Sequence, residues 1–478
     1  MRISTIVFEN ELSEGYRDTE GAIYSKDRRR LLRGPVSCSQ YRIKSGTKTI
    51  CNEAFKYCSC LVSVDIPDTV VNIGDEAFAG CRQLTSIEIP KSVIDIGSNP
   101  FYDTDISTIN NHSDHFIVDD NALYDQDRSI LISVFGNPNY FNIPNTVRRI
   151  GNCAFNSCTS LKFVEIPDSV TRIGHNAFEY CFSLQSIKIP DSVSFIGREA
   201  FGGCSTLSFV EIPDSIKHIY NNTFSDCNNL HAVIIPDTIT SIDDEAFSGC
   251  KCLKSIKIPE SVTKIGVNPF NSSGICEIEN YSNHYETKND ILYSKEQGVL
   301  ISYFGRHSSV IIPDGICRIG KKAFSSNRYI EYISIPDRIK IIEKETFSFC
   351  RSLKYIELPE GLTLIDEGSF WGCENLQYIR IPETVRKIEF LAFSGCERIV
   401  SIKIPHGVQN IGMSVFADCH SLEIIELPST VKTISHDAFQ DCESLQAILI
   451  NTNSNREFNR IKKIIERYSY LLMMKQSY

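Results

Sequence analysis

The sequence predicts a single β-solenoid built from stacked 23-residue coils, and three regularities support this prediction. An Ile-Pro or Leu-Pro pair recurs every 23 residues in three groups, which run from Pro67 to Pro90, from Pro144 to Pro259 and from Pro313 to Pro428. A column of phenylalanines keeps the same period, and the two breaks between the groups have the same length. Periods of about 20 to 50 residues are typical of solenoids, in which each repeat buries its apolar side against its neighbours.

Phenylalanine marks the same units. Fifteen phenylalanines follow the 23-residue period, from Phe55 to Phe101, from Phe155 to Phe270 and from Phe324 to Phe439. Each break spans 54 residues, which equals one unit of 23 plus one of 31. We therefore expect one coil type and one longer variant to account for almost the whole chain.

The longer variant contains a recurring segment that we predict to form a hairpin-like arm. The segment occurs three times, as GAIYSKDRRRLLR, NALYDQDRSILIS and DILYSKEQGVLIS. Its tyrosine is Tyr24, Tyr124 and Tyr293 in the three copies. The fold thus includes three 31-residue hairpin-like variant units.

Residues 161–181 show how one coil is built. The opening Leu-x-x-Val-x-Ile alternates apolar and polar positions near its end, as a half-buried strand does. Pro167 ends that strand, because proline donates no ladder hydrogen bond. A turn leads to a second short extended piece at residues 170–173. We predict that residues 176–181 form a short helical or 3₁₀ turn that directs the repeat phenylalanine inward.

The repeat stops after residue 450, and a helix is predicted over residues 456–475. Its apolar residues fall at spacings of three and four. They are Phe458, Ile461, Ile465, Tyr468 and Leu472. Such a helix would cover the open edge of the last coil. The chain is therefore divided into an N-terminal cap with the first hairpin-like unit (1–42), the solenoid (43–450) and a C-terminal capping helix (451–478).

The repeat pattern L-x-x-I-x-I-P-x-[ST]-V-x-x-I-G-x-x-A-F-x-x-C resembles the BspA-type leucine-rich repeats over about residues 43–450. The hairpin-like arms are similar to the insert of that family. The resemblance implies a leucine-rich repeat solenoid that binds proteins, often as a surface antigen or adhesin.

Cysteine use predicts buried, reduced thiols. Neighbouring coils separate equivalent Cβ atoms by about 4.8 Å, which exceeds the usual separation of about 3.8 Å in a disulfide. No Cys-x-x-Cys pair or histidine partner accompanies them, so we expect no metal site. An odd total of nineteen cysteines favours a reducing compartment. Twelve of them lie three residues after a repeat phenylalanine: Cys58, Cys81, Cys158, Cys181, Cys204, Cys227, Cys250, Cys350, Cys373, Cys396, Cys419 and Cys442.

Composition excludes several classes of protein. The chain has 478 residues, 42% of them hydrophobic, and a net charge of −10. The apolar content excludes a disordered chain, and the acidic balance argues against a nucleic-acid partner. There is no run of 18 apolar residues, so we expect no membrane insertion. The first 25 residues contain no apolar run of signal-peptide length. We therefore expect a cytoplasmic location, with a cell-surface or secreted location as the alternative.

No catalytic or cofactor-binding constellation emerges from the motifs. The stretch from Gly315 to Lys322 approaches a phosphate-binding loop, but Lys322 replaces the hydroxyl residue that would bind magnesium. The ten histidines are scattered. We therefore predict that the protein is not an enzyme and needs no cofactor.

The outward positions of the first strand of each coil are the candidate partner-binding residues. Tyr332, Tyr355 and Tyr378 belong to consecutive coils, so we expect them to stack as a stripe. Exposed tyrosine beside charged residues is typical of interface hot spots. The same neighbours also stabilise a sheet by about 0.2–1 kcal/mol per pair, so lattice stabilisation is the alternative. The other candidates are Phe163, Glu165, Lys188, Phe209, Glu211, Glu357, Arg380 and Lys403.

Together these observations predict a monomeric, non-enzymatic scaffold that binds a protein partner along the sheet face of its solenoid. One alternative is a surface antigen or adhesin that binds a host or matrix protein. A second alternative is an accessory to an enzyme complex.

Overall fold

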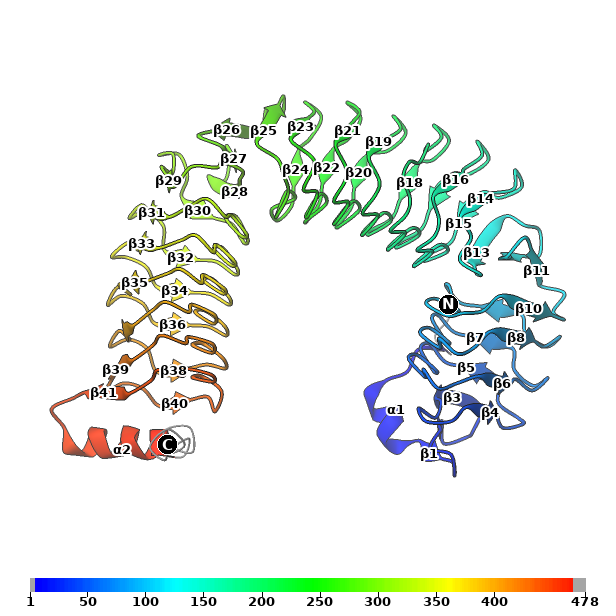
Figure 1. Ribbon diagram of the computed structural model, residues 1–478, viewed down its shortest axis with the longest axis horizontal. Helices are drawn as coiled ribbons and strands as arrows, with labels where there is room; N and C mark the ends of the chain where they lie inside the picture. The colour runs from blue at the N-terminus through cyan, green and yellow to red at the C-terminus, as the bar shows by residue number, and fades with distance from the viewer. Residues whose placement is uncertain (1–4, 467–478) are drawn as a thin grey trace. The chain divides into compact units, whose positions relative to one another are not determined.

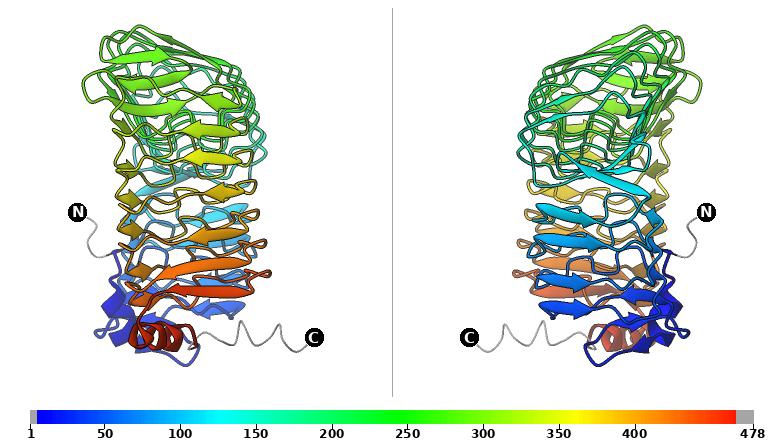
Figure 2. Two further views of the ribbon diagram at one scale, coloured as in Figure 1. Left: turned by 90° about the vertical axis from the view of Figure 1, so that its left-hand side faces the viewer. Right: turned by 90° about the vertical axis from the view of Figure 1, so that its right-hand side faces the viewer.

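The computed structural model describes residues 5–466, and the chain forms two compact units (Figure 1). Of the described residues, unit 1 comprises 5–242 and 249–253, and unit 2 comprises 243–248 and 254–466. Within each unit the coils stack with parallel strands, and Figure 2 shows these strands as successive rungs. The predicted leucine-rich repeat solenoid of about 23-residue coils is confirmed.

Most coils have a first strand before the repeat proline and a second strand before the following bend. The first strands of unit 1 are β4 (Gln40–Arg42), β6 (Ser63–Asp65), β8 (Ser86–Ile89), β10 (Thr108–Asn111), β14 (Tyr140–Asn142), β16 (Phe163–Glu165), β19 (Phe209–Glu211) and β21 (Ala232–Ile234). Those of unit 2 are β23 (Ser255–Ile258), β25 (Glu277–Asn280), β29 (Ser309–Val310), β31 (Tyr332–Ser334), β33 (Tyr355–Glu357), β35 (Tyr378–Ile379), β37 (Ser401–Lys403), β39 (Ile424–Pro428) and β41 (Ala447–Asn451).

The second strands are only two residues long, and the isoleucine that ends each of them points toward the core. In unit 1 they are β5 (Thr49–Ile50), β7 (Asn72–Ile73), β9 (Asp95–Ile96), β15 (Arg149–Ile150), β17 (Arg172–Ile173), β18 (Phe195–Ile196), β20 (His218–Ile219) and β22 (Ser241–Ile242). In unit 2 they are β24 (Lys264–Ile265), β30 (Arg318–Ile319), β32 (Ile341–Ile342), β34 (Leu364–Ile365), β36 (Lys387–Ile388), β38 (Asn410–Ile411) and β40 (Thr433–Ile434).

The third side of each coil consists of turns that bond to the next coil. The amide of Phe155 donates to the carbonyl of Ala177 at 2.8 Å, and similar bonds join successive coils. Within a turn, isolated bonds link residues three apart, as from Cys181 to Phe178 at 3.2 Å. The predicted helical or 3₁₀ turn is present in this form rather than as a helix. Asn176 and Tyr180 adopt positive φ angles of 55° and 59°, which would interrupt a helix.

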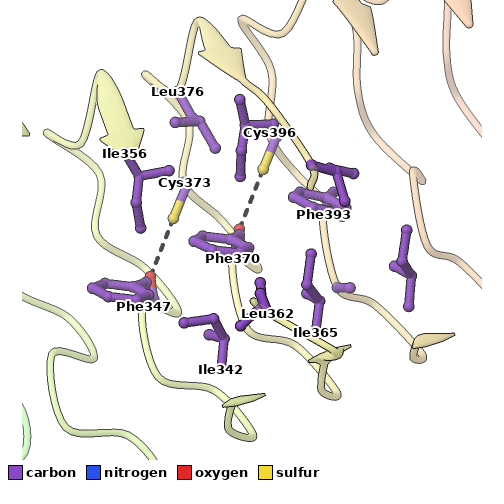
Figure 3. Close-up of a cluster of buried hydrophobic side chains, with 14 of the residues drawn as sticks. Ile342, Phe347, Ile356, Leu362, Ile365, Phe370, Cys373, Leu376, Phe393 and Cys396 are labelled. Atoms are coloured by element: carbon purple, nitrogen blue, oxygen red, sulfur yellow. Dashed lines mark hydrogen bonds between the residues drawn. The ribbon is translucent and has the colours of Figure 1, made fainter. Parts of the chain in front are cut away.

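The core of each unit contains columns of stacked phenylalanine rings. In unit 2, the rings of Phe347, Phe370 and Phe393 lie parallel, with centroids 5.5 and 5.3 Å apart (Figure 3). All three side chains are fully buried. Each coil therefore buries its aromatic ring against the same ring of its neighbour, as the 23-residue period predicts.

The hairpin-like arms are three-stranded antiparallel meanders. Their strands are β1 (Tyr16–Arg17), β2 (Ile23–Tyr24) and β3 (Arg30–Arg33); β11 (Phe116–Asp119), β12 (Ala122–Asp125) and β13 (Ile130–Val134); and β26 (Tyr285–Lys288), β27 (Ile291–Ser294) and β28 (Val299–Tyr303). The last strand of each arm pairs in parallel with the next second strand, so the arm joins the solenoid without breaking its ladder. Two of the hairpin turns, Asp120-Asn121 and Asn289-Asp290, have positive φ at both positions.

A helix lies at each end of the described chain. The short helix α1 (Glu9–Glu14) is tied to β3 by an ion pair between Glu11 and Arg30 at 2.6 Å. The helix α2 (Asn455–Glu466) inserts Ile461 into the core of unit 2. The C-terminal capping helix is thus confirmed. The predicted continuation to residue 475, with Tyr468 and Leu472, lies outside the described residues.

Candidate functional site

The exposed side of the first strands follows from their period-two pattern. In β33, Ile356 is buried, whereas Tyr355 and Glu357 on either side of it are exposed. Because successive side chains of a strand point to opposite faces, the flanking pair faces away from the core. The same alternation holds in β16 and β19, which carry Phe163 with Glu165 and Phe209 with Glu211.

In unit 2 the structure brings three tyrosines into one column, here called the tyrosine column: Tyr332, Tyr355 and Tyr378. The parallel register places Tyr332 opposite Tyr355 and Tyr355 opposite Tyr378. The rings of Tyr355 and Tyr378 have centroids 6.2 Å apart and planes tilted by 46°. Their exposed fractions are 39%, 49% and 50% in chain order. About half of each side chain thus remains available after the cross-strand contacts have formed.

Charged residues follow the tyrosine column along the same face. The guanidinium of Arg380, directly after β35, forms an ion pair with Glu360. The ammonium of Lys403 in β37 lies 3.2 Å from Glu383. In both pairs the acidic residue precedes its partner by 20 residues. The predicted site residues Arg380 and Lys403 are therefore exposed and positioned by glutamates of the preceding coil.

Hydrogen bonding couples tyrosines to glutamates of the next coil. The Glu357 carboxylate accepts a hydrogen bond from Tyr332 and raises the pKa of its phenol. In unit 1, partial desolvation and the Glu165 carboxylate raise the pKa of Tyr140 in the same way. Glu165 and Glu357 thus help to orient the neighbouring aromatic rings.

The corresponding surface of unit 1 is less regular. Phe163 and Phe209 are exposed by 45% and 42%. Residues 182–190 between their strands form no strand, and Lys188 lies exposed in that segment. Phe163 is instead paired with Tyr140 of the preceding coil, which is itself 50% exposed.

Sequence reasoning did not select Tyr140, Glu360 or Glu383 as site residues. Counting 23 residues back from Phe163 would have reached Tyr140, but the preceding arm interrupts the period there. Glu360 and Glu383 each follow a repeat proline, where the sequence predicts an ordinary turn. Their role appears only when the coils are stacked.

The described residues gather no set of metal ligands, and most of the cysteine thiols are buried. Over residues 5–466 no group of three His, Cys, Asp or Glu side chains is placed to hold a metal ion. None of the nineteen cysteines forms a disulfide, and burial raises the pKa of Cys58 to about 11 and of Cys350 to about 12. Lys322, in the stretch that approaches a phosphate-binding loop, is instead engaged by Glu245 at 2.7 Å and Glu345 at 3.4 Å. Among the described helices, none is long and apolar enough to cross a membrane.

The sequence matches the family described as BspA type Leucine rich repeat region, which comprises six copies of the repeat. The matched residues are 48–137, 133–231, 171–297, 304–399 and 365–463. The chain belongs to the BspA-type leucine-rich repeat family. The predicted family resemblance is therefore confirmed.

Solved structures of leucine-rich repeat proteins resemble this member of the family. A leucine rich cell surface protein from Faecalibacterium prausnitzii A2-165 is 30% identical, with 72% of this chain and 97% of that chain covered and a TM-score of 0.54. The pneumococcal vaccine antigen PcpA is 19% identical, with coverages of 74% and 96% and a TM-score of 0.56, and shares the fold. No curated protein matches the sequence.

Proposed function

We propose that this BspA-type protein is a non-enzymatic scaffold that binds a protein partner along the exposed face of its first strands. The tyrosine column of unit 2 is the observation that supports this proposal most strongly. Tyrosine buries a large area at low entropic cost and is enriched among the residues that dominate binding energy. Its flanking charges, Glu357, Arg380 and Lys403, would form the polar rim of the interface.

Stabilisation of the sheet accounts for only part of this arrangement. A cross-strand aromatic pair contributes about 0.2–1 kcal/mol to a sheet. The cross-strand contacts nevertheless leave half of Tyr355 and Tyr378 exposed. Burying the remaining apolar area of these rings against a partner would add about 25 cal/mol per Å². We propose that the corresponding face of unit 1, with Phe163, Glu165, Lys188, Phe209 and Glu211, also binds a partner.

The cellular location separates two versions of this proposal. Nineteen free cysteines favour a scaffold in a reducing, cytoplasmic compartment. The similarity to a leucine rich cell surface protein at 30% identity favours a surface antigen or adhesin. Fractionation of the source organism, followed by detection of this chain, distinguishes the two.

The binding proposal is tested by affinity capture from a lysate of the source organism with the full chain as bait. We expect one or more proteins to bind the wild type and to be lost with Tyr355→Ser/Tyr378→Ser. The matched control is Tyr57→Ser/Tyr180→Ser, which changes exposed tyrosines on the turn side of unit 1. Melting curves of both variants confirm folding. An unchanged capture profile with Tyr355→Ser/Tyr378→Ser would count against the tyrosine column.

A further inference from the structure

A second surface of unit 1 carries positive charges that the described chain does not neutralise. We call it the basic patch, and it consists of Arg148, Arg149, Arg172, Arg198 and Lys217. All five residues are exposed. By contrast, Arg42, Arg82 and Arg128 of the same unit each pair with an aspartate at 2.7 to 2.9 Å. Within residues 5–466, no carboxylate forms an ion pair with any member of the basic patch.

The basic patch is built on the second strands, so it is distinct from the tyrosine column. β15, β17 and β18 pair in parallel, with Arg149 opposite Arg172 and Arg172 opposite Phe195. Such strands lie about 4.8 Å apart. The guanidinium of Arg172 lies 4.2 Å from the centroid of the Phe195 ring. This cation–π contact holds the guanidinium in place without neutralising it.

A neighbouring column brings in Arg198. The amide of Arg198 donates to Nδ1 of His175 at 2.9 Å, and the amide of His175 donates to Oδ1 of Asn152 at 3.0 Å. The His175 ring also meets the Phe195 ring edge-on, with centroids 5.6 Å apart. Burial, together with the charges of Arg198, Arg172 and Arg149, lowers the pKa of His175. The guanidiniums of Arg149, Arg172 and Arg198 lie in two adjacent columns, and all three create a positive potential at the His175 ring.

Acidic groups beside the basic patch have other hydrogen-bond partners. The Glu199 carboxylate accepts a bond from Asn176 at 2.8 Å. On the N-terminal side, Arg149 lines an open hollow of about 800 Å³ together with four aspartates, Asp75, Asp95, Asp125 and Asp127. Asp125 accepts bonds from the Ser129 hydroxyl at 2.8 Å and the Ile130 amide at 2.7 Å. Glu199, Asp125 and Asp127 mark the edge of the basic patch. Each already accepts hydrogen bonds, Glu199 from the preceding coil and the two aspartates from their own turn.

We propose that the basic patch binds an acidic segment of a partner protein, rich in aspartate and glutamate. Clustered like charges repel one another, and a bound anion would relieve that repulsion. The attraction is local, because the net charge of the whole chain is −10. Guanidinium groups bind carboxylates through two parallel hydrogen bonds. The side chains on one face of an extended peptide recur about every 6.6–6.8 Å, so a short acidic stretch would span the coils from Arg149 to Arg198.

The aromatic residues favour a peptide over a nucleic acid. A nucleotide base would need a free aromatic face on which to stack. One face of Phe195 is covered by Arg172, and Tyr220 packs against the same ring with centroids 5.5 Å apart.

The test measures binding of a fluorescein-labelled decaglutamate peptide to the full chain by fluorescence anisotropy. We expect saturable binding at low salt that weakens as the salt concentration rises, because screening shortens the range of the attraction. Arg149→Gln/Arg172→Gln should weaken the affinity by about tenfold, as expected when charge-assisted contacts are lost. The matched control, Arg42→Gln/Arg82→Gln, removes the same charge from paired arginines of unit 1 and should change the affinity less than about twofold.

Three results would overturn the proposal. One is the absence of saturable binding at low salt. Another is an equal loss of affinity in the control variant, which would show that net charge rather than the basic patch attracts the peptide. The third is displacement of the labelled peptide by decathymidylate as efficiently as by unlabelled decaglutamate, which would indicate a general polyanion or nucleic-acid surface. Melting curves of each variant establish that the fold is retained.

Discussion

The thiol of Cys373 donates a hydrogen bond to the backbone carbonyl of Phe347 at 3.1 Å (Figure 3). The two residues are 26 apart, so the bond joins one coil to the next. The Phe347 carbonyl also accepts the amide of Cys350 at 3.1 Å. The repeat cysteine therefore fills a small core position and links neighbouring coils. Equivalent thiol bonds of 3.0 to 3.2 Å are made by Cys81, Cys181, Cys204, Cys227, Cys250, Cys350, Cys396, Cys419 and Cys442.

We expect Cys373→Ala to lower the free energy of unfolding by about 1–2 kcal/mol. The substitution removes a buried sulfur and one weak hydrogen bond, but the Phe347 carbonyl keeps its bond from Cys350. Denaturant unfolding of the two proteins measures the difference. The exposed Cys317→Ala is the control and should change the stability by less than about 0.5 kcal/mol. Equal effects of the two substitutions would contradict a structural role for the buried thiol.

Thiol labelling should separate the cysteines by their exposure. We expect a maleimide at neutral pH to modify the exposed Cys60, Cys276 and Cys317 rapidly in the native protein. The fully buried ladder, which includes Cys181 and Cys373, should react only when the chain opens, because the reagent needs an accessible thiolate. Peptide mass spectrometry after timed labelling identifies the modified sites. Rapid native labelling of Cys181 or Cys373 would contradict their burial.

Alkaline pH should destabilise the fold. Burial raises the pKa of Cys81, Cys158 and Cys350 to about 12 each, from an ordinary value of 9.0. Above about pH 9 the unfolded chain therefore releases thiol protons that the folded chain retains, and unfolding becomes more favourable. The stabilising contribution is complete below pH 9 and is lost as the pH rises toward 12. We expect the denaturation midpoint to fall steadily between about pH 9 and about pH 12. A constant midpoint over that range would contradict the raised pKa values of the buried thiols.

The sequence allowed the stacking to be predicted because burial in a solenoid repeats with the chain. The 23-residue period of phenylalanine and cysteine reports which positions face the core, and the structure buries those columns. The period does not report where a hydrogen-bond donor points. The bond from Cys373 to Phe347 and the positive φ of Asn176 both depend on how one coil lies on the next. Such details of the turn side could not be derived from one repeat.

As with the fold, only part of the candidate site could be predicted from the sequence. The tyrosine column follows from equal spacing alone, because residues 23 apart meet in the parallel register. The ion-pair partners of the charged residues do not follow from the 23-residue spacing. Arg380 pairs with Glu360, 20 residues earlier, because the lengths of the two side chains allow them to meet there. The basic patch also required the structure. Arg198 and Arg172 belong to different columns, and only the stacked coils show that neither forms an ion pair with a carboxylate of the described residues.

Phe201→Ala should destabilise unit 1 by about 3–5 kcal/mol, because a fully buried aromatic ring would be replaced by a cavity. The ring of Phe201 lies between those of Phe178 and Phe224, with centroids 5.4 and 5.5 Å away and nearly parallel planes. Denaturant unfolding measures the loss. The exposed Phe209→Ala serves as control and should cost less than about 1 kcal/mol. A loss below about 1 kcal/mol for Phe201→Ala would be inconsistent with this packing.

The capping helix α2 should protect the last coils of unit 2 through two contacts. Ile461 is fully buried in the core of unit 2, and the Arg460 guanidinium donates to the carbonyls of Ser429 and Val431 at 2.6 and 2.5 Å. We expect Ile461→Ala to destabilise this end by about 2–5 kcal/mol, because a buried isoleucine side chain is lost.

Hydrogen exchange tests this expectation by coil rather than for the whole chain. The amides of β38 and β40 should exchange faster in Ile461→Ala, whereas amides of unit 1 should keep their protection, because the coils of a solenoid are stabilised mainly by their neighbours. Phe458→Ala, at a residue of the same helix that is 44% exposed, is the matched control and should leave the exchange of β40 nearly unchanged. If β40 exchanges at the wild-type rate in Ile461→Ala, the helix covers the last coil without stabilising it.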